Sequence, residues 1–252
     1  MKLTFLGTGT SQGVPVIGCN CSVCKSEDFR DRRFRTSVLV ESKTTSVVID
    51  TGPDFRMQML NCNQQQLDAV IFTHEHKDHV AGFDDIRAFN FKSKKDMEVF
   101  CSERVLTALK REFHYIFNDN KYPGVPRANV NLIDKNSQFK IGDIDFKTLE
   151  VMHYKLPVFS YRINDLVYIT DANFINANEL QKIKGCKVLI INALRKEKHL
   201  SHFNLEEALE LAEIVKPDKV FLTHISHLMG KHSSINLPKN VEIAYDGLQI
   251  SF

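Results

Sequence analysis

Five polar residues each follow a short apolar run, and this regularity constrains the fold more than any other feature of the sequence. The runs read SVVI, VIFT, VYIT, LII and VFLT, and the residues after them are Asp50, His74, Asp171, Asn192 and His224. The length and β-branched composition of the runs predict strands. Because ligands bind at the carboxyl ends of strands in layered α/β proteins, we expect these five side chains to meet at one edge of the structure.

Further runs of the same kind predict strands throughout the chain. They cover residues 3–6, 37–40, 46–49, 69–72, 98–100, 145–151, 159–163, 166–169, 187–191, 219–222 and 241–244. Amphipathic patterns predict helices over 104–117 and 204–215, the second with Asn204 as N-cap and Pro217 beyond its end. Many strands with interspersed helices indicate α/β layers, with helices covering a mixed sheet or a pair of packed sheets. Without repeats or long linkers, residues 1–252 read as a single domain.

The composition is that of an ordinary globular protein, with 43% hydrophobic and 25% charged residues. The sequence contains no run of about 18 apolar residues, so we expect no membrane span. The N-terminus lacks the long apolar segment of a secretory signal, so we expect a cytoplasmic location. The net charge is +2 and acids dilute the basic runs, so we do not expect a nucleic-acid or membrane partner.

A segment that directly follows one predicted strand carries the strongest chemical signal. It reads His-x-His-x-Asp-His and places His74, His76, Asp78 and His79 within six residues. Imidazole nitrogens and a carboxylate suit zinc, manganese or iron. We expect a loop here, because a loop lets such closely spaced side chains point to two adjacent metals. The alternative, a solvated turn of histidines and aspartates, rarely has this pattern.

This motif resembles that of the metallo-β-lactamase superfamily. The five motifs of that family are matched in order over almost the whole chain, by Asp50, residues 74–79, His153, Asp171 and His224. The resemblance implies a metallo-hydrolase of the α/β class. Its expected fold is two mixed β-sheets packed face to face with flanking helices, an αββα sandwich.

The resemblance also implies a two-metal centre and its ligands. One metal is expected on His74, His76 and His153, the other on Asp78, His79 and His224, with Asp171 bridging both. Asp50 either orients a ligand histidine through its ring N–H or shapes a strand-end turn. In the oxygen-handling diiron members of the superfamily, a glutamate stands where His76 stands here, so the histidine favours hydrolysis over redox chemistry.

A cysteine cluster indicates a second kind of metal site. Cys19, Cys21 and Cys24 form a Cys-x-Cys-x-x-Cys pattern, and three thiolates need a fourth ligand to complete a tetrahedral zinc site. Three unrelated thiols are the alternative. The glycine-rich segment before them resembles the start of the phosphodiesterases associated with the carbon–phosphorus lyase pathway. That resemblance implies a structural zinc completed by His227, with His232 as the competing candidate.

His202 lies in a Ser-His-Phe-Asn segment just before the second predicted helix. In the same phosphodiesterases, a histidine in a similar segment approaches the metal-bound phosphate. The resemblance therefore implies that His202, together with the metal ligand Asp78, takes part in catalysis. The alternative is a solvent-exposed flank of the helix.

The resemblance implies a metal-dependent phosphodiesterase. Its expected substrates are small cyclic phosphates or nucleotide-like phosphodiesters, attacked by a hydroxide that two divalent zinc or manganese ions activate. One structural zinc completes the expected cofactors, and a homodimer is compatible with the sequence. Three different functions stay open: a tRNA 3′-processing nuclease, a lactone or thioester hydrolase, and a non-catalytic carrier on the same scaffold.

Overall fold

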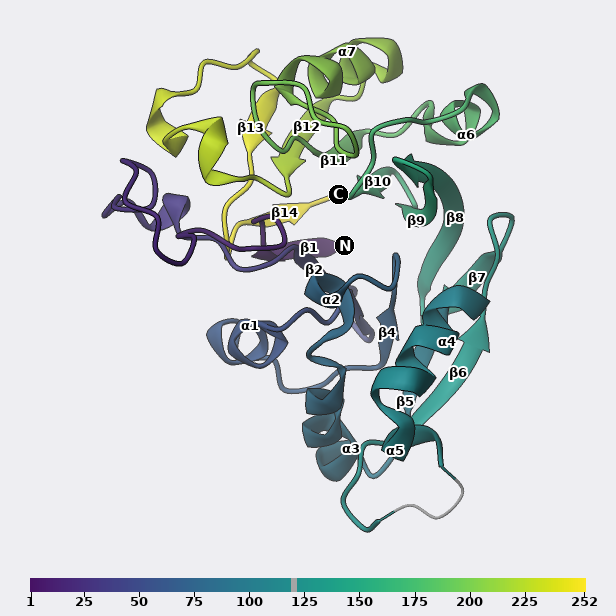
Figure 1. Cartoon of the computed structure of the whole chain (residues 1–252). Coiled ribbons are helices and arrows are strands. Elements are labelled where there is room, and N and C mark those ends of the chain that lie inside the picture. The colour runs from purple at the N-terminus through teal and green to yellow at the C-terminus, as the bar shows by residue number, and fades with distance from the viewer. Residues whose placement is uncertain (119–121) are drawn as a thin grey trace.

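The protein is built from two seven-stranded sheets that pack face to face (Figure 1). This description rests on a computed structural model, which describes residues 1–118 and 122–252. The first sheet has the order β14-β1-β2-β3-β4-β5-β6 and the second the order β13-β12-β11-β10-β9-β8-β7. Each sheet combines four parallel neighbours with an antiparallel part, so both are mixed.

The strand bounds define the two layers. The first sheet contains β1 (Lys2–Gly7), β2 (Ser37–Glu41), β3 (Ser46–Ile49), β4 (Ala69–Ile71), β5 (Met97–Cys101), β6 (Ala128–Leu132) and β14 (Gln249–Ser251). The second sheet contains β7 (Gln138–Ile141), β8 (Ile144–His153), β9 (Leu156–Ile163), β10 (Leu166–Ile169), β11 (Val188–Asn192), β12 (Lys219–Thr223) and β13 (Val241–Ile243).

Helices cover the outer face of each sheet. The first sheet is covered by α1 (Phe55–Asn61), α2 (Lys77–Val80), α3 (Arg87–Ser93), α4 (Glu103–Glu112) and α5 (His114–Phe117). The second sheet is covered by α6 (Ala177–Ile183) and α7 (Leu205–Val215). Short 3₁₀ turns complete the elements, namely η1 (Phe29–Asp31), η2 (Phe83–Ile86), η3 (His227–Met229) and η4 (His232–Ser234).

Burial on both faces explains why the central strands have continuous apolar sequences. In β3 every residue is buried: Val47 and Ile49 contact the core between the sheets, and Val48 faces the helices. Strands covered on both faces read as unbroken hydrophobic runs, whereas half-exposed strands alternate. The sandwich and its flanking helices confirm the expected fold class.

Two differences from the expected elements have local causes. The helix expected over 104–117 is two helices, because the backbone leaves the helical region at Phe113 (φ −117°, ψ 42°). Strand β6 was not expected because its sequence, ANVNL, is polar. In the structure Asn129 and Asn131 each donate a side-chain hydrogen bond to Glu98 on β5, so these polar side chains pair across the strands.

Helix α7 agrees with its sequence signals. The Asn204 side chain accepts a hydrogen bond from the Glu207 backbone N–H (2.9 Å), and the Glu207 side chain accepts one from the backbone N–H of Asn204 (3.0 Å). This capping box fixes the start of the helix and the direction of the loop before it.

Across the described ranges, 1–118 and 122–252, no helix combines the length and apolar character needed to cross a bilayer.

Candidate metal centre

The expected metal ligands lie at the carboxyl ends of strands from both sheets. His74 follows β4 of the first sheet, while His153 ends β8, Asp171 follows β10 and His224 follows β12 of the second sheet. Asp171 and His224 have left-handed backbones, with φ of 54° and 57°. Such values are uncommon outside glycine and concentrate at functional sites, where the surrounding structure holds them in place.

Three histidines form the first group of potential ligands. The ligand atoms of His74, His76 and His153 lie within 4.8 Å of one another. His74 Nε2 and His76 Nδ1 are 3.0 Å apart. His74 and His153 are buried, whereas His76 is exposed, so the group opens to solvent on the side of His76.

The second group contains Asp78, His79, Asp171 and His224, again with ligand atoms within 4.8 Å of one another. Asp78 and His79 lie on α2, so the expectation of a loop for the whole motif is wrong for its second half. Consecutive residues of a helical turn point about 100° apart, yet the two side chains converge, with Asp78 Oδ2 3.2 Å from His79 Nε2.

Asp171 lies between the two groups. Its Oδ2 atom is 3.9 Å from His74 Nε2, in the first group. Its Oδ1 atom is 3.4 Å from His79 Nε2 and 3.2 Å from His224 Nε2, in the second group. One carboxylate oxygen therefore faces each group, which is the arrangement that a bridging ligand requires.

Hydrogen bonds to the outer ring nitrogens orient three of the histidines. His153 Nδ1 lies 2.7 Å from Ser201 O; because a carbonyl only accepts, Nδ1 carries the proton. His79 Nδ1 lies 2.7 Å from Asp50 Oδ2. His74 Nδ1 donates to Thr73 Oγ1 (3.0 Å), whose own proton goes to Asp50 Oδ2 (2.8 Å). In the neutral form of each ring, Nδ1 therefore holds the proton and Nε2 is free to bind a metal ion.

Burial and neighbouring charges shift the pKa values of several groups in this site. Burial alone would lower the pKa of His79, but the carboxylates of Asp78, Asp171 and Asp50 raise it well above the usual range. Burial also raises the pKa of Asp50, so both partners of this pair show a raised value. We place the proton on His79, because Asp50 also accepts hydrogen bonds from the backbone N–H and hydroxyl of Thr73. Burial and the neighbouring His79 hold the pKa of His74 well below its usual range.

Unpaired buried nitrogens indicate that these groups fit metal ions. Within the described residues, His79 Nε2 and His224 Nε2 are buried and have no hydrogen-bond partner, despite their close carboxylate oxygens. A buried polar atom without a partner costs about 1–3 kcal/mol. A divalent cation among the nitrogens and carboxylates would satisfy these atoms and the negative charge together.

His202 lies beside the metal ligands rather than on an exposed helix flank. It is 8% exposed, and its Nδ1 atom lies 4.0 Å from Asp171 Oδ2. Its ring is stacked on that of His224, with centroids 4.7 Å apart. Burial and the adjacent His224 lower the pKa of His202 to about 3. Because its ligand atom is within 4.8 Å of those of His153 and Asp171, His202 has the geometry of a ligand as well as of a proton donor.

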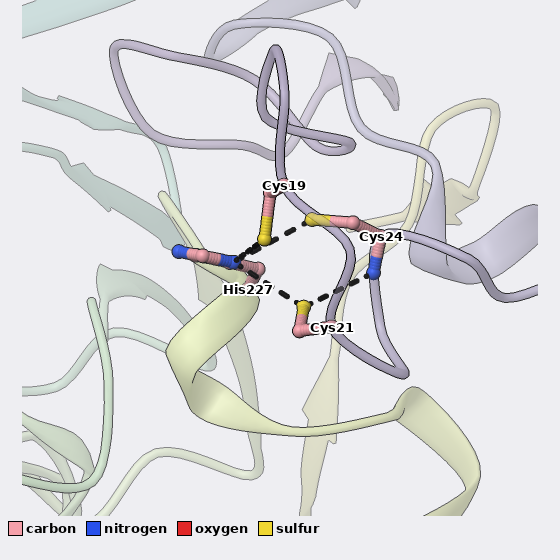
Figure 2. A group of neighbouring side chains, drawn as sticks. All are labelled: Cys19, Cys21, Cys24 and His227. Carbon is pink, nitrogen blue, oxygen red and sulfur yellow. Dashed lines mark hydrogen bonds between the residues drawn. The ribbon is translucent and has the colours of Figure 1, made fainter.

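The three clustered cysteines surround one histidine (Figure 2). The Sγ atoms of Cys19, Cys21 and Cys24 lie 3.3, 3.4 and 3.5 Å from Nδ1 of His227. Tetrahedral zinc, with bonds of about 2.3 Å to sulfur and 2.0–2.1 Å to nitrogen, places these atoms about 3.5 Å apart. His227 supplies the nitrogen, whereas His232 Nδ1 lies 3.4 Å from Arg33 Nη2.

The cysteine cluster ties the two ends of the chain together. Its sulfurs come from the N-terminal loop, and His227 lies on η3, near the C-terminus (Figure 2). The backbone N–H of Cys24 is the main cause that lowers the pKa of Cys21 to about 6, while burial raises the pKa of Cys24 to about 11. Zinc would favour the thiolate form of both.

Two contacts at this site could not be expected from the sequence. Ser201 O orients His153 across a large separation in sequence, and His199 lies 5.2 Å from the His202 ring, measured between centroids. The only local signal was that both residues adjoin His202 in the Ser-His-Phe-Asn segment.

Comparisons with known proteins place these features in a family. The family model of the β-lactamase superfamily domain matches residues 45–225. An octanoyltransferase from Porphyromonas gingivalis is 39% identical over 255 residues, which cover 99% of this chain and 51% of that protein. The chain thus spans about half the length of the curated relatives it matches first.

Two solved structures are similar along their whole length. A diphosphatase from the PhnP family is 34% identical, with a TM-score of 0.93, and the alignment covers 100% of this chain and 97% of that one. Zinc-bound PqqB from Methylobacterium extorquens has a TM-score of 0.77 at 16% identity, covers 100% of both chains, and is similar in fold.

Proposed function

Because this chain belongs to the metallo-β-lactamase superfamily and is a metal-dependent hydrolase, we propose that it hydrolyses small phosphodiesters. The expected substrates are cyclic phosphates or nucleotide-like diesters. The observation that carries this proposal is His202, a buried imidazole with an unpaired Nδ1 atom beside the candidate bridging carboxylate of Asp171. An additional polar donor at such a site suits a substrate that carries negatively charged oxygens.

The two ligand groups would hold divalent ions, zinc or manganese, which when bound supply charge neutralisation and activation of a water. His74, His76 and His153 form one candidate set, and Asp78, His79 and His224 the other, with Asp171 shared. Asp50, Thr73 and Ser201 keep the ligating rings in the required tautomer and orientation.

His202 would act on the phosphate and on the leaving oxygen. Its pKa of about 3 makes the ring neutral near pH 7, so that it offers one N–H. An anionic phosphate nearby favours the protonated ring, because an opposite charge stabilises the imidazolium. A protonated His202 then donates a charged hydrogen bond and delivers a proton to a departing alkoxide.

A diphosphate linkage is the second candidate substrate. The observation that favours it is the diphosphatase of the PhnP family, which is similar over the whole chain. Both reactions displace an oxygen from phosphorus, so the same donors would serve either.

A nuclease, an acyl hydrolase and a carrier protein have weaker support. Human tRNase Z is similar in fold at 17% identity, but the sequence of this chain has no extended basic arm for RNA. The octanoyltransferase name favours acyl chemistry, yet this chain matches 51% of that protein. The presence of all seven ligand positions argues against a non-catalytic carrier.

The test is a substrate panel with the His202→Ala variant. Metal-reconstituted protein is offered a 2′,3′-cyclic nucleotide, bis(p-nitrophenyl) phosphate, a dinucleoside diphosphate, a lactone and a thioester. We expect turnover of the phosphate substrates. His202→Ala should lower kcat for the cyclic nucleotide by about 10²–10⁴-fold.

The loss should be smaller for the p-nitrophenyl substrate, because p-nitrophenolate leaves without a proton. Metal content should match that of the wild type; a loss of metal would instead identify His202 as a ligand. Preferential turnover of the lactone or thioester would refute the proposed substrate class.

A further inference from the structure

Asn192 is a fully buried amide at the centre of the candidate site, and none of the roles above uses it. It ends β11, which lies between β10 and β12, the strands that precede Asp171 and His224. The side chain is 0% exposed. A buried amide needs partners for its oxygen and its NH₂ group, so its contacts show what it holds in place.

Both polar atoms of Asn192 bind the backbone of one residue, Ala172. Asn192 Oδ1 accepts from the Ala172 N–H, and Asn192 Nδ2 donates to Ala172 O, each at 2.9 Å. Such a two-point contact fixes the orientation of the peptide units on both sides of Ala172. One of these units belongs to Asp171, whose left-handed backbone (φ 54°) needs support from its surroundings.

The carbonyl oxygen of Ala172 also accepts a hydrogen bond from the loop that carries His202. The Phe203 backbone N–H donates to Ala172 O at 2.6 Å, so this oxygen accepts from Phe203 and Asn192 together. Asp171 directly precedes Ala172, and His202 directly precedes Phe203. The separation of His202 Nδ1 and Asp171 Oδ2, 4.0 Å, is therefore set by a chain of three short contacts that begins at Asn192.

The two residues that follow Asn192 are also held in place by backbone hydrogen bonds. Ala193 N–H donates to Thr223 O on the neighbouring strand (2.9 Å), and Leu194 N–H donates to Phe203 O (2.9 Å). The amide thus projects from a central strand that has little freedom to shift.

We propose that Asn192 is a positioning residue that holds the candidate bridging ligand Asp171 and the candidate proton donor His202 at a fixed separation. Part of this inference rests on the proposed function, since it assigns His202 a role toward the leaving group. The other part, the placement of Asp171 as a metal ligand, is independent of the substrate.

The test uses two variants and a matched control. Asn192→Leu keeps the shape of the side chain and removes both hydrogen bonds, and Asn192→Ala serves if the leucine variant fails to fold. Asn90→Ala is the control, because Asn90 is 5% exposed and its amide makes the same two-point contact, with the backbone N–H (2.9 Å) and the carbonyl (3.0 Å) of Arg127. It lies on α3 and, among the described residues, makes no hydrogen bond to Ala172 or Phe203.

The first readout is zinc affinity, measured by competition with a chelator. We expect the Asn192 variants to bind zinc about 10–100-fold more weakly, the usual effect of removing a residue that orients a ligand. Asn90→Ala should keep the wild-type affinity. Equal affinities in all variants would overturn the placement of Asp171 by Asn192, whatever the substrate proves to be.

The second readout, at saturating metal, compares the 2′,3′-cyclic nucleotide with bis(p-nitrophenyl) phosphate. Displacing a proton donor by about 1 Å costs about 10²-fold, so we expect that loss in kcat for the cyclic nucleotide and a smaller one for the aryl diester. In the background of His202→Ala, the Asn192 change should cause no further selective loss, since residues that act as a unit are not additive.

Equal losses on both substrates, or losses that multiply in the double variant, would overturn the role toward His202. A wild-type protein that turns over neither phosphate substrate refutes the proposed function instead, while the zinc measurement still decides the placement of Asp171.

Discussion

Asp50→Asn tests whether the ring orientation of His79 controls metal binding. Asp50 is 0% exposed and accepts from His79 Nδ1 at 2.7 Å and from the backbone N–H and hydroxyl of Thr73, both at 2.8 Å. An asparagine has one acceptor oxygen and an NH₂ group in place of the second. To satisfy that NH₂ group, His79 must accept at Nδ1, which moves its proton to Nε2, toward the metal.

The expected magnitude follows from that change of tautomer. Loss of a group that orients a ligand costs about 10–100-fold in metal affinity, or about 1.4–2.8 kcal/mol. The assay is competition with a chelator, followed by kcat/KM at saturating metal. Activity should recover in part as metal is added, because the ligand is misdirected and not removed.

Asp246→Asn is the matched control. Asp246 is a half-buried carboxylate that likewise accepts from a backbone N–H, that of Phe34 (2.6 Å), and from a threonine hydroxyl, that of Thr8 (2.7 Å). It has no histidine partner at hydrogen-bond distance among the described residues. If Asp50→Asn binds metal as tightly as Asp246→Asn and the wild type, the role of Asp50 in orienting His79 is refuted.

Three further predictions concern the metals and the stability of the fold. Cys21→Ser should lower the melting temperature and remove one zinc equivalent while the two-metal centre stays loaded, because structural zinc stabilises the fold directly; unchanged zinc content would contradict it. Asp171→Ala should remove at least one divalent ion, measured by elemental analysis, because its carboxylate faces both ligand groups; wild-type metal content with full activity would refute the two-metal assignment. Burial raises the pKa of Asp246 from 3.8 to about 7, so the contribution of this carboxyl group to stability should fall as the pH rises from about 4 to 7, by up to about 4 kcal/mol. The side chain of Asp246→Asn stays neutral, so in urea unfolding the free energy of unfolding of this variant should rise relative to that of the wild type over that range. If the difference between the two free energies does not change with pH, the raised pKa is contradicted.

The fold and the grouping of the candidate ligands at one edge were accessible from the sequence because both depend on local patterns. A buried strand requires a run such as VIFT, and the polar residue after it, His74, falls at the sheet edge through the geometry of parallel strands. The capping box of Asn204 and Glu207 is likewise a signal within four residues.

Contacts between residues distant in the chain were not accessible. The backbone carbonyl of Ser201 orients His153, and no side-chain pattern reports where a carbonyl will lie. In the sequence, Asn192 was only one of five polar residues that follow apolar runs. Its hydrogen bonds to Ala172 depend on the pairing of β10 with β11. The position of His227, and not His232, beside the three cysteines similarly depends on how the N-terminal loop packs in three dimensions.

The division of the ligands between the two sheets has a mechanical consequence. His74 and His79 belong to the first sheet and Asp171 and His224 to the second, so ions held between them cross-link the layers at one edge. Backbone hydrogen bonds also join the sheets at this edge, from Phe159 N–H to Thr73 O (3.0 Å) and from Ile225 N–H to Thr8 O (2.8 Å), and bound ions would reinforce this connection. Metal loading should therefore slow amide hydrogen exchange at the ends of β4, β10 and β12 far more than in the middle of the same strands. The apolar core protects the middle of these strands whether or not metal is bound, whereas the ions would stabilise only the edge.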